Sequence, residues 1–208
     1  MIFDSLRNKA VPHARSSCPN CNTPLIAKCG SIMIWHWAHE TLEHCDDWWE
    51  PISEWHLAWQ EKVLEECREV RVGHHIADIK LSSGRVVEIQ HSSLSVEIMQ
   101  EREEFYGDMV WIFDGRPFLK SLLINEKISK KGNHYCTFHW RRPRHYIIQC
   151  TRQVFIDLGD RVLEVKEFQS REKEWQGRAY TSWNGWGFFH AKDENLFITK
   201  LFDRDFIG

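Results

Sequence analysis

The sequence predicts a mixed α/β (α+β) protein whose middle part has the order helix, three strands, helix, strand. Two observations lead to this prediction. In residues 53–67 and 95–107, apolar side chains recur at helical spacing, and each segment begins with serine, a common N-cap. The segments 69–90 and 109–113 are rich in Val and Ile and are bounded by turn residues, as strands are.

Three parts are expected along the 208 residues. Residues 1–47 form a zinc-finger-like region, residues 48–116 form the core, and residues 117–208 form a β-rich module of unknown role. A chain of this length can hold one sizeable core and a smaller appendage.

The first helix is predicted in SEWHLAWQEKVLEEC, residues 53–67, and a short strand in EVRV, residues 69–72. Ser53 is the expected N-cap, and one face carries Trp59, Val63 and Cys67 at four-residue spacing. The second helix is predicted in residues 95–107, ended by a glycine. MVWIF, residues 109–113, is a continuous apolar run, typical of a strand covered on both faces.

A β-hairpin is predicted between the two helices, in HHIADIKLSSGRVVEIQHSS. The two apolar runs flank a Ser-Ser-Gly turn. If Ser82–Gly84 form a three-residue loop, Leu81 pairs with Arg85. Counting outward from that pair places Asp78 directly opposite Glu88.

Opposed residues on one face of a hairpin have Cβ atoms about 4.5–5.5 Å apart, and Gln90 lies two residues further along the same face. Because neighbouring carboxylates repel, Asp78 and Glu88 suggest a cation between them. Mg²⁺ or Mn²⁺ held there would lower the pKa of an attacking water, which Gln90 can orient. The alternative is a solvated hairpin face that carries ordinary charges.

Eight motifs in this chain resemble the competence protein CoiA-like family, whose members are predicted nucleases with a zinc region in front. They are CPNC (18–21), WHWAHE (35–40), HCDDWWE (44–50), EWHLAWQEK (54–62), HIADI (75–79), VEIQHSS (87–93), EREEFY (101–106) and MVWIFDG (109–115). The resemblance implies a restriction-endonuclease-like core that acts on DNA, in bacterial or phage DNA metabolism. In that fold a helix-borne Glu joins the Asp and the Glu-x-Lys of the hairpin.

The lysine of this pattern is Gln90 here, which the family shares, so a positive charge must come from another residue. Lys80, on the face of Asp78, and Lys62, from the first helix, are the candidates. The family also tends to carry an acid where this chain has Ile52.

Glu50 and Glu54 flank Ile52, and either can serve as the helix carboxylate that completes the metal shell or acts as a base. We favour Glu54, which falls in the first turn, where the helix dipole stabilises a carboxylate. The competing interpretation is that Glu54 only caps the helix.

A structural zinc site is predicted in the N-terminal region, with Cys18, Cys21, His36 and His39 as ligands. Two residues between the cysteines let both sulfurs reach one tetrahedral ion. His44 and Cys45 follow closely, and Cys18, Cys21, His39 and Cys45 form the alternative set. A region this small buries too little apolar surface to fold without a metal.

The net charge of −3 and the pI of about 6.5 do not indicate nucleic-acid binding by the protein as a whole. Any DNA contact must come from local basic residues, for which the candidates are Lys130, Lys131, Arg141, Arg142 and Arg144. Aromatic residues are interleaved with them, as on surfaces that stack bases, although solvated loop charges explain most of the basic residues equally well.

Seven cysteines and an N-terminus without an apolar signal segment or membrane span predict a cytoplasmic protein with reduced thiols. In the last part of the chain we expect a helix in residues 118–133, strands in 146–150, 153–158, 161–168 and 178–189, and a helix in 193–202. No chemistry is assigned there, and the module can recruit a protein partner.

The resulting hypothesis is a metal-dependent DNA nuclease or DNA-processing protein. Two other classes compete with it. One is a non-catalytic nucleic-acid-binding or partner-recruiting protein that retains the nuclease fold, which Gln90 favours. The other is a protein-interaction factor that works through its aromatic C-terminal part.

Overall fold

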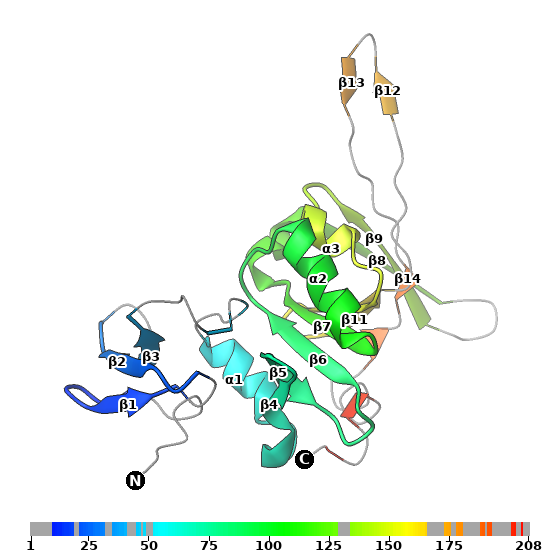
Figure 1. The fold of residues 1–208 in the computed structure, drawn as a ribbon. Helices are drawn as coiled ribbons and strands as arrows, with labels where there is room; N and C mark the ends of the chain where they lie inside the picture. Colours follow the sequence, from blue (N-terminus) through cyan, green and yellow to red (C-terminus); the bar gives the residue numbers. More distant parts are fainter. Residues whose placement is uncertain are drawn as a thin grey trace. The chain divides into compact units, whose positions relative to one another are not determined.

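The computed structural model describes residues 10–18, 21–31, 35–40, 45–46, 48, 52–128, 134–165, 173–175, 178–180, 188–189, 191–192, 201–202 and 205. These residues form a mixed α/β structure, which confirms the predicted class. The chain divides into two compact units, residues 1–80 and 81–206. Figure 1 shows the helices and strands of both.

The first unit begins with a small antiparallel sheet of three strands in the order β1-β2-β3. The strands are β1 (Arg15–Ser17), β2 (Pro24–Lys28) and β3 (His36–His39). Among the described residues of this region, the buried core of the sheet consists of Ala10, Cys18, Leu25 and Trp37. So small a core supports the expectation that the region needs a metal.

Helix α1 (Glu54–Gln60) is shorter than predicted. Ser53 caps it as expected, because its Oγ accepts a hydrogen bond from the amide of His56 at 3.2 Å. The prediction of a helix as far as Cys67 is wrong. The amides of Lys62 and Val63 bond three residues back instead of four, a tightening that ends the helix, and a 3₁₀ turn, η1 (Glu65–Cys67), follows.

Strands β4 (Arg68–Val72) and β5 (His75–Lys80) complete the first unit as an antiparallel pair. Burial alternates along β5, with His75, Ala77 and Ile79 buried. Asp78 and Lys80 therefore share the less buried face, as the sequence predicted.

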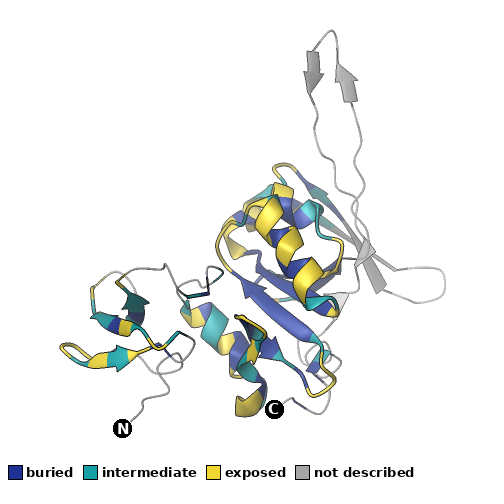
Figure 2. Ribbon diagram, in the orientation of Figure 1, coloured by how far each residue is buried: buried dark blue, intermediate teal, exposed yellow. Residues whose placement is uncertain are grey.

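The second unit is built on five strands in the order β15-β11-β10-β7-β6. They are β6 (Val86–Gln90), β7 (Met109–Asp114), β10 (Gln153–Asp157), β11 (Val162–Val165) and β15 (Ala191–Lys192). Strands β6, β7 and β10 are parallel. Every residue of β6 and β7 is buried, which confirms that residues 109–113 form a covered strand (Figure 2).

Helix α2 (Val96–Tyr106) runs between β6 and β7 in the chain, and Figure 2 shows its outer face exposed. The predicted caps are confirmed. Ser95 Oγ accepts a hydrogen bond from the amide of Ile98 at 3.2 Å, and Gly107 ends the helix with a φ of 67°. The helix packs on the sheet through Glu103, which accepts a hydrogen bond from Trp111 Nε1 at 3.0 Å.

The turn before β6 has the predicted form. The amide of Leu81 donates to the carbonyl of Arg85 at 2.9 Å, and the amide of Gly84 donates back to Leu81 at 2.8 Å. Gly84 has a φ of 91°, a left-handed conformation that other residues rarely adopt. Ser82–Gly84 therefore form the three-residue loop from which the hairpin register was counted.

The predicted helix in residues 118–133 is wrong. A 3₁₀ turn, η2 (Arg116–Ser121), leads into the antiparallel strands β8 (Leu122–Ile128) and β9 (His134–Trp140). Tertiary contacts determine that this segment forms strands and not a helix. Phe118 stacks on buried Trp140 with ring centroids 4.7 Å apart, and Trp140 Nε1 donates to Ser121 Oγ at 3.0 Å.

The predicted strand in residues 146–150 is also wrong, because the short helix α3 (His145–Ile148) buries Tyr146 against Phe113. Strands β12 (Lys173–Trp175), β13 (Arg178–Tyr180) and β14 (Phe188–Phe189) are short. Of the helix predicted in 193–202, all but the last two residues lie outside the described residues. Within the described part of the chain, no helix is long and apolar enough to cross a membrane.

Candidate functional site

Four side chains of the first unit form a compact cluster that can hold a metal ion. The ligand atoms of Cys18, Cys21, His39 and Cys45 all lie within 4.8 Å of one another. The sulfurs of Cys18 and Cys45 are 3.6 Å apart, and Cys21 Sγ lies 3.3 Å from His39 Nε2. Two thiolates bound to one tetrahedral zinc at ~2.3 Å lie about 3.8 Å apart, so the observed spacing fits a zinc ion.

The proton chemistry of the cluster also fits a cation. Burial opposes ionisation of Cys21, but hydrogen bonds with Thr23 and His39 outweigh it and lower the pKa of Cys21 to about 6. Burial and the neighbouring thiols of Cys18 and Cys21 raise the pKa of Cys45 to about 12. Several thiolates can share this space only when a cation offsets their charge.

The structure brings Cys45 into the cluster in place of His36, and so forms the alternative ligand set. His36 and His39 lie at opposite ends of β3, paired with Lys28 and Leu25 respectively. Three residues along a strand span about 10 Å, and alternation directs the two side chains to opposite faces. His44 lies outside the described residues.

Asp46, the residue after Cys45, ties this cluster to strand β5. Its buried carboxylate accepts hydrogen bonds from His75 Nδ1 at 2.7 Å, from the Ile76 amide at 2.8 Å and from the Trp48 amide at 3.0 Å. The Trp48 ring stacks on His75, with centroids 3.3 Å apart. The metal region and the strand that carries Asp78 are therefore joined by a buried polar contact.

We expect Asp46→Ala to destabilise the protein by about 1–3 kcal/mol, because the donors on His75 and Ile76 lose a charged acceptor. Urea unfolding at neutral pH measures the change. Glu61→Gln, at an exposed position of the same unit, is the control and should stay within about 0.5 kcal/mol of the parent protein. Equal stabilities of the two variants would contradict the role of Asp46.

The side chain of His56, on α1, reaches the carboxylate of Asp78. Its Nε2 lies 3.2 Å from Asp78 Oδ1. Glu54, the favoured helix carboxylate, is on the exposed face of α1, and Glu50 lies outside the described residues. Lys62 contacts the ring of Trp59, with Nζ 5.5 Å from the centroid.

Glu88 and Gln90 lie on β6 of the second unit and are both buried. Glu88 Oε2 forms an ion pair with Arg102 Nη1 of α2 at 3.0 Å. The positive charge beside this carboxylate therefore comes from the Arg102 guanidinium. The Gln90 amide nitrogen donates to the carbonyl and hydroxyl of Ser92 at 3.1 and 3.0 Å. Both side chains are held in fixed positions.

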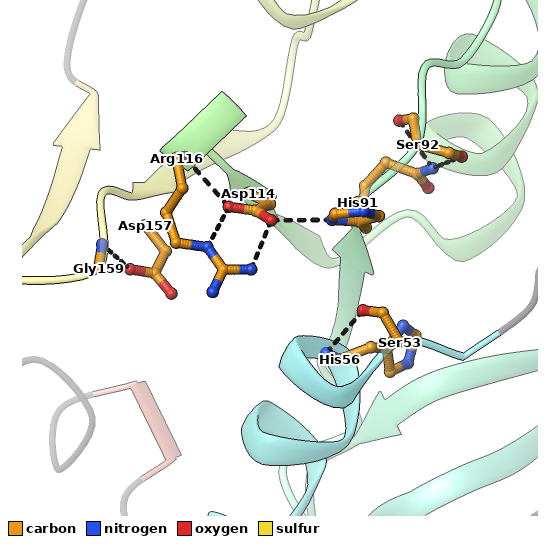
Figure 3. Close-up of polar contacts among 9 residues, drawn as sticks. Ser53, His56, His91, Ser92, Asp114, Arg116, Asp157 and Gly159 are labelled. Carbon is orange, nitrogen blue, oxygen red and sulfur yellow. Dashed lines mark hydrogen bonds and ion pairs between the residues drawn. The ribbon is translucent and has the colours of Figure 1, made fainter. Parts of the chain in front are cut away.

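Sequence reasoning missed a polar cluster at the carboxyl ends of β6, β7 and β10 (Figure 3). Buried Asp114, the last residue of β7, accepts hydrogen bonds from His91 Nδ1 at 2.8 Å and from Arg116 Nε and Nη2 at 2.8 and 2.7 Å. Asp157 ends β10 in register with Asp114. The available signal was an acid at the end of each apolar strand, MVWIFD and QVFID.

Burial works against ionisation of Asp114, but hydrogen bonds from Arg116 and His91 outweigh it and lower its pKa. The ionised carboxylate therefore stabilises the fold above its unfolded-state pKa of about 3.9, and this stabilisation is lost as the pH falls through the lower folded-state pKa. We expect Asp114→Asn to be less stable than the parent protein at pH 7, and this difference to shrink as the pH falls below about 4. Urea unfolding at several pH values tests this; a constant difference would contradict it.

Of the candidate nucleic-acid contacts, Arg141, Arg142 and Arg144 are exposed around the segment between β9 and α3. Lys130 and Lys131 lie outside the described residues. The described part of this basic stretch is thus available to solvent, as a backbone-contacting surface requires.

Residues 5–47 match the family model of the competence protein CoiA N-terminal domain. No curated protein and no solved structure matches the chain. The matched range includes the four residues of the metal cluster, Cys18, Cys21, His39 and Cys45. The match supports the resemblance that the sequence motifs indicated, because residues 5–47 are similar to the CoiA N-terminal domain.

Proposed function

We propose that this protein is a metal-dependent nuclease that hydrolyses phosphodiester bonds in DNA, or a DNA-processing protein derived from one. The observation that carries the proposal is the pair of strands on either side of the Leu81–Arg85 turn. One strand holds Asp78 beside an imidazole, and the other holds Glu88 buried beside a guanidinium. The element order and the CoiA-type N-terminal domain support it.

In this proposal the metal-binding carboxylates are Asp78 and Glu88, which the sequence register counted from the turn predicts to be a pair. Mg²⁺ or Mn²⁺ bound to these carboxylates supplies an activated water and offsets charge on the phosphate. Arg102 holds the Glu88 carboxylate in place through an ion pair of 3.0 Å. Ser92 fixes the Gln90 amide, whose oxygen can orient a water.

The zinc region has a structural role in this proposal, bracing the core or clamping DNA. Arg141, Arg142 and Arg144, together with Lys130 and Lys131, contact the DNA backbone. The C-terminal module can add a protein partner. We propose that the protein acts in the cytoplasm, where reduced thiols are available to bind zinc.

A second candidate function is binding of nucleic acid or a partner without catalysis. It is favoured by the Glu88–Arg102 pair, since that carboxylate has a charged partner without any metal. Gln90 favours it as well, because an amide brings no positive charge to a phosphate.

Cleavage of single- and double-stranded DNA in Mg²⁺, Mn²⁺ or EDTA decides between the two. We expect cleavage that requires the divalent ion and stops in EDTA. Binding without cleavage under every condition would overturn the nuclease and support the second candidate.

A further inference from the structure

The imidazole of His56, on α1, lies beside the proposed catalytic carboxylate of Asp78. The distance from His56 Nε2 to Asp78 Oδ1 is 3.2 Å, and the two side chains are 12% and 23% exposed. They are thus largely buried yet within reach of solvent. The family resemblance implied that a carboxylate from this helix, and not an imidazole, would join Asp78 at the metal.

Hydrogen bonds at both ends of α1 fix the helix that carries this imidazole. At the start of the helix, Ser53 Oγ accepts a hydrogen bond from the His56 amide at 3.2 Å (Figure 3). One turn later, Gln60 Nε2 donates to the carbonyl of Asp78 at 3.1 Å and to Glu69 Oε1 at 3.4 Å. The helix is therefore tied to the backbone of the residue whose carboxylate His56 contacts.

We propose that His56 and Asp78 bind the same divalent ion, and that the imidazole nitrogen makes this centre select Mn²⁺ over Mg²⁺. The inference rests on the proposed function, since it concerns the same metal centre. Neighbouring ligands of an octahedral ion with bonds of about 2.1 Å lie about 3.0 Å apart, so the spacing of the two atoms suits one ion.

The selectivity follows from the donor type. Mg²⁺ prefers oxygen ligands and loses its waters reluctantly, whereas first-row transition ions accept imidazole readily. A centre made only of carboxylates would discriminate weakly between the two ions. With a nitrogen ligand added, Mn²⁺ gains a bond that Mg²⁺ uses poorly.

The test is Mn²⁺ binding to the full chain loaded with zinc, followed by electron paramagnetic resonance, with Mg²⁺ binding followed by calorimetry. We expect Mn²⁺ to bind at least about tenfold more tightly than Mg²⁺. Pulsed measurements on bound Mn²⁺ should detect coupling to a directly bound ¹⁴N. His56→Asn should remove that coupling and weaken Mn²⁺ binding by about tenfold or more, with little effect on Mg²⁺. His74→Asn, at an exposed histidine of the same unit, should change neither.

The ¹⁴N measurement on the parent protein needs no variant, so it stands even if His56→Asn folds poorly. Bound Mn²⁺ without nitrogen coupling would overturn the inference, and cleavage of DNA by that protein would leave the nuclease proposal intact. Nitrogen-coupled Mn²⁺ in a protein that never cleaves DNA would support the inference and overturn the nuclease proposal. Equal Mn²⁺ binding by the parent protein and by His56→Asn would also overturn the inference.

Discussion

Glu88→Ala is expected to abolish metal-dependent DNA cleavage and to destabilise the second unit by about 3–5 kcal/mol. The activity is lost because the proposed centre loses a metal ligand. The stability is lost for another reason. Glu88 and Arg102 form a pair whose side chains are only 3% and 6% exposed, and breaking a buried pair from one side is costly. Cleavage assays and urea unfolding measure the two effects separately.

A double variant separates folding from chemistry. Glu88→Leu combined with Arg102→Met replaces the pair by apolar side chains, which should recover most of the lost stability. It should remain inactive, because no carboxylate returns. Recovery of cleavage in this variant would show that Glu88 has only a structural role.

Asp78→Asn supplies the matched comparison. Asp78 is partly exposed, and its described partner is an imidazole and not a buried guanidinium. We therefore expect it to lose cleavage as fully as Glu88→Ala does while losing about 1 kcal/mol of stability or less. If Asp78→Asn cleaved DNA at the parent rate, the assignment of the catalytic centre to this hairpin would be wrong.

The elements that the sequence predicts correctly are those with a local cause. Ser95 and Gly107 cap α2 through their own backbone neighbourhoods. Gly84 allows the left-handed residue of the turn before β6. The apolar run in residues 109–113 has no polar face to present to solvent, so it becomes a covered strand. None of these assignments needs knowledge of a distant contact.

The errors arise where distant contacts decide. Residues 122–128 form a strand because Phe118 and Ser121 are held by Trp140 from the partner strand. The Asp114 cluster forms only when parallel strands bring their carboxyl ends to one edge.

The candidate site follows the same division. The Cys18 and Cys21 pair is a local motif and was predicted, whereas the third and fourth ligands depend on the path of the chain. His56 was overlooked because the resemblance directed attention to carboxylates. Its proximity to Asp78 depends on how α1 lies on β5.

The metal content of two variants will decide between the two zinc ligand sets. Cys45→Ser is expected to lose the zinc ion, and His36→Asn is expected to keep about one per chain, because Cys45 and not His36 belongs to the cluster. Elemental analysis of the purified proteins measures this. Cys29→Ser, a cysteine of the same region outside the cluster, is the control and should keep its zinc.

Loss of zinc is expected to unfold the N-terminal region, since its own core is small and metal binding supplies much of its folding free energy. Because Asp46 follows Cys45 directly, the buried contacts from His75 and Ile76 should loosen as well. Hydrogen exchange of the Ile76 amide should therefore accelerate in Cys45→Ser and stay at the parent rate in Cys29→Ser. Zinc loss in His36→Asn with retention in Cys45→Ser would establish the other ligand set. Zinc loss without faster exchange at Ile76 would show that the metal braces only its own sheet, and that Asp46 holds β5 by itself.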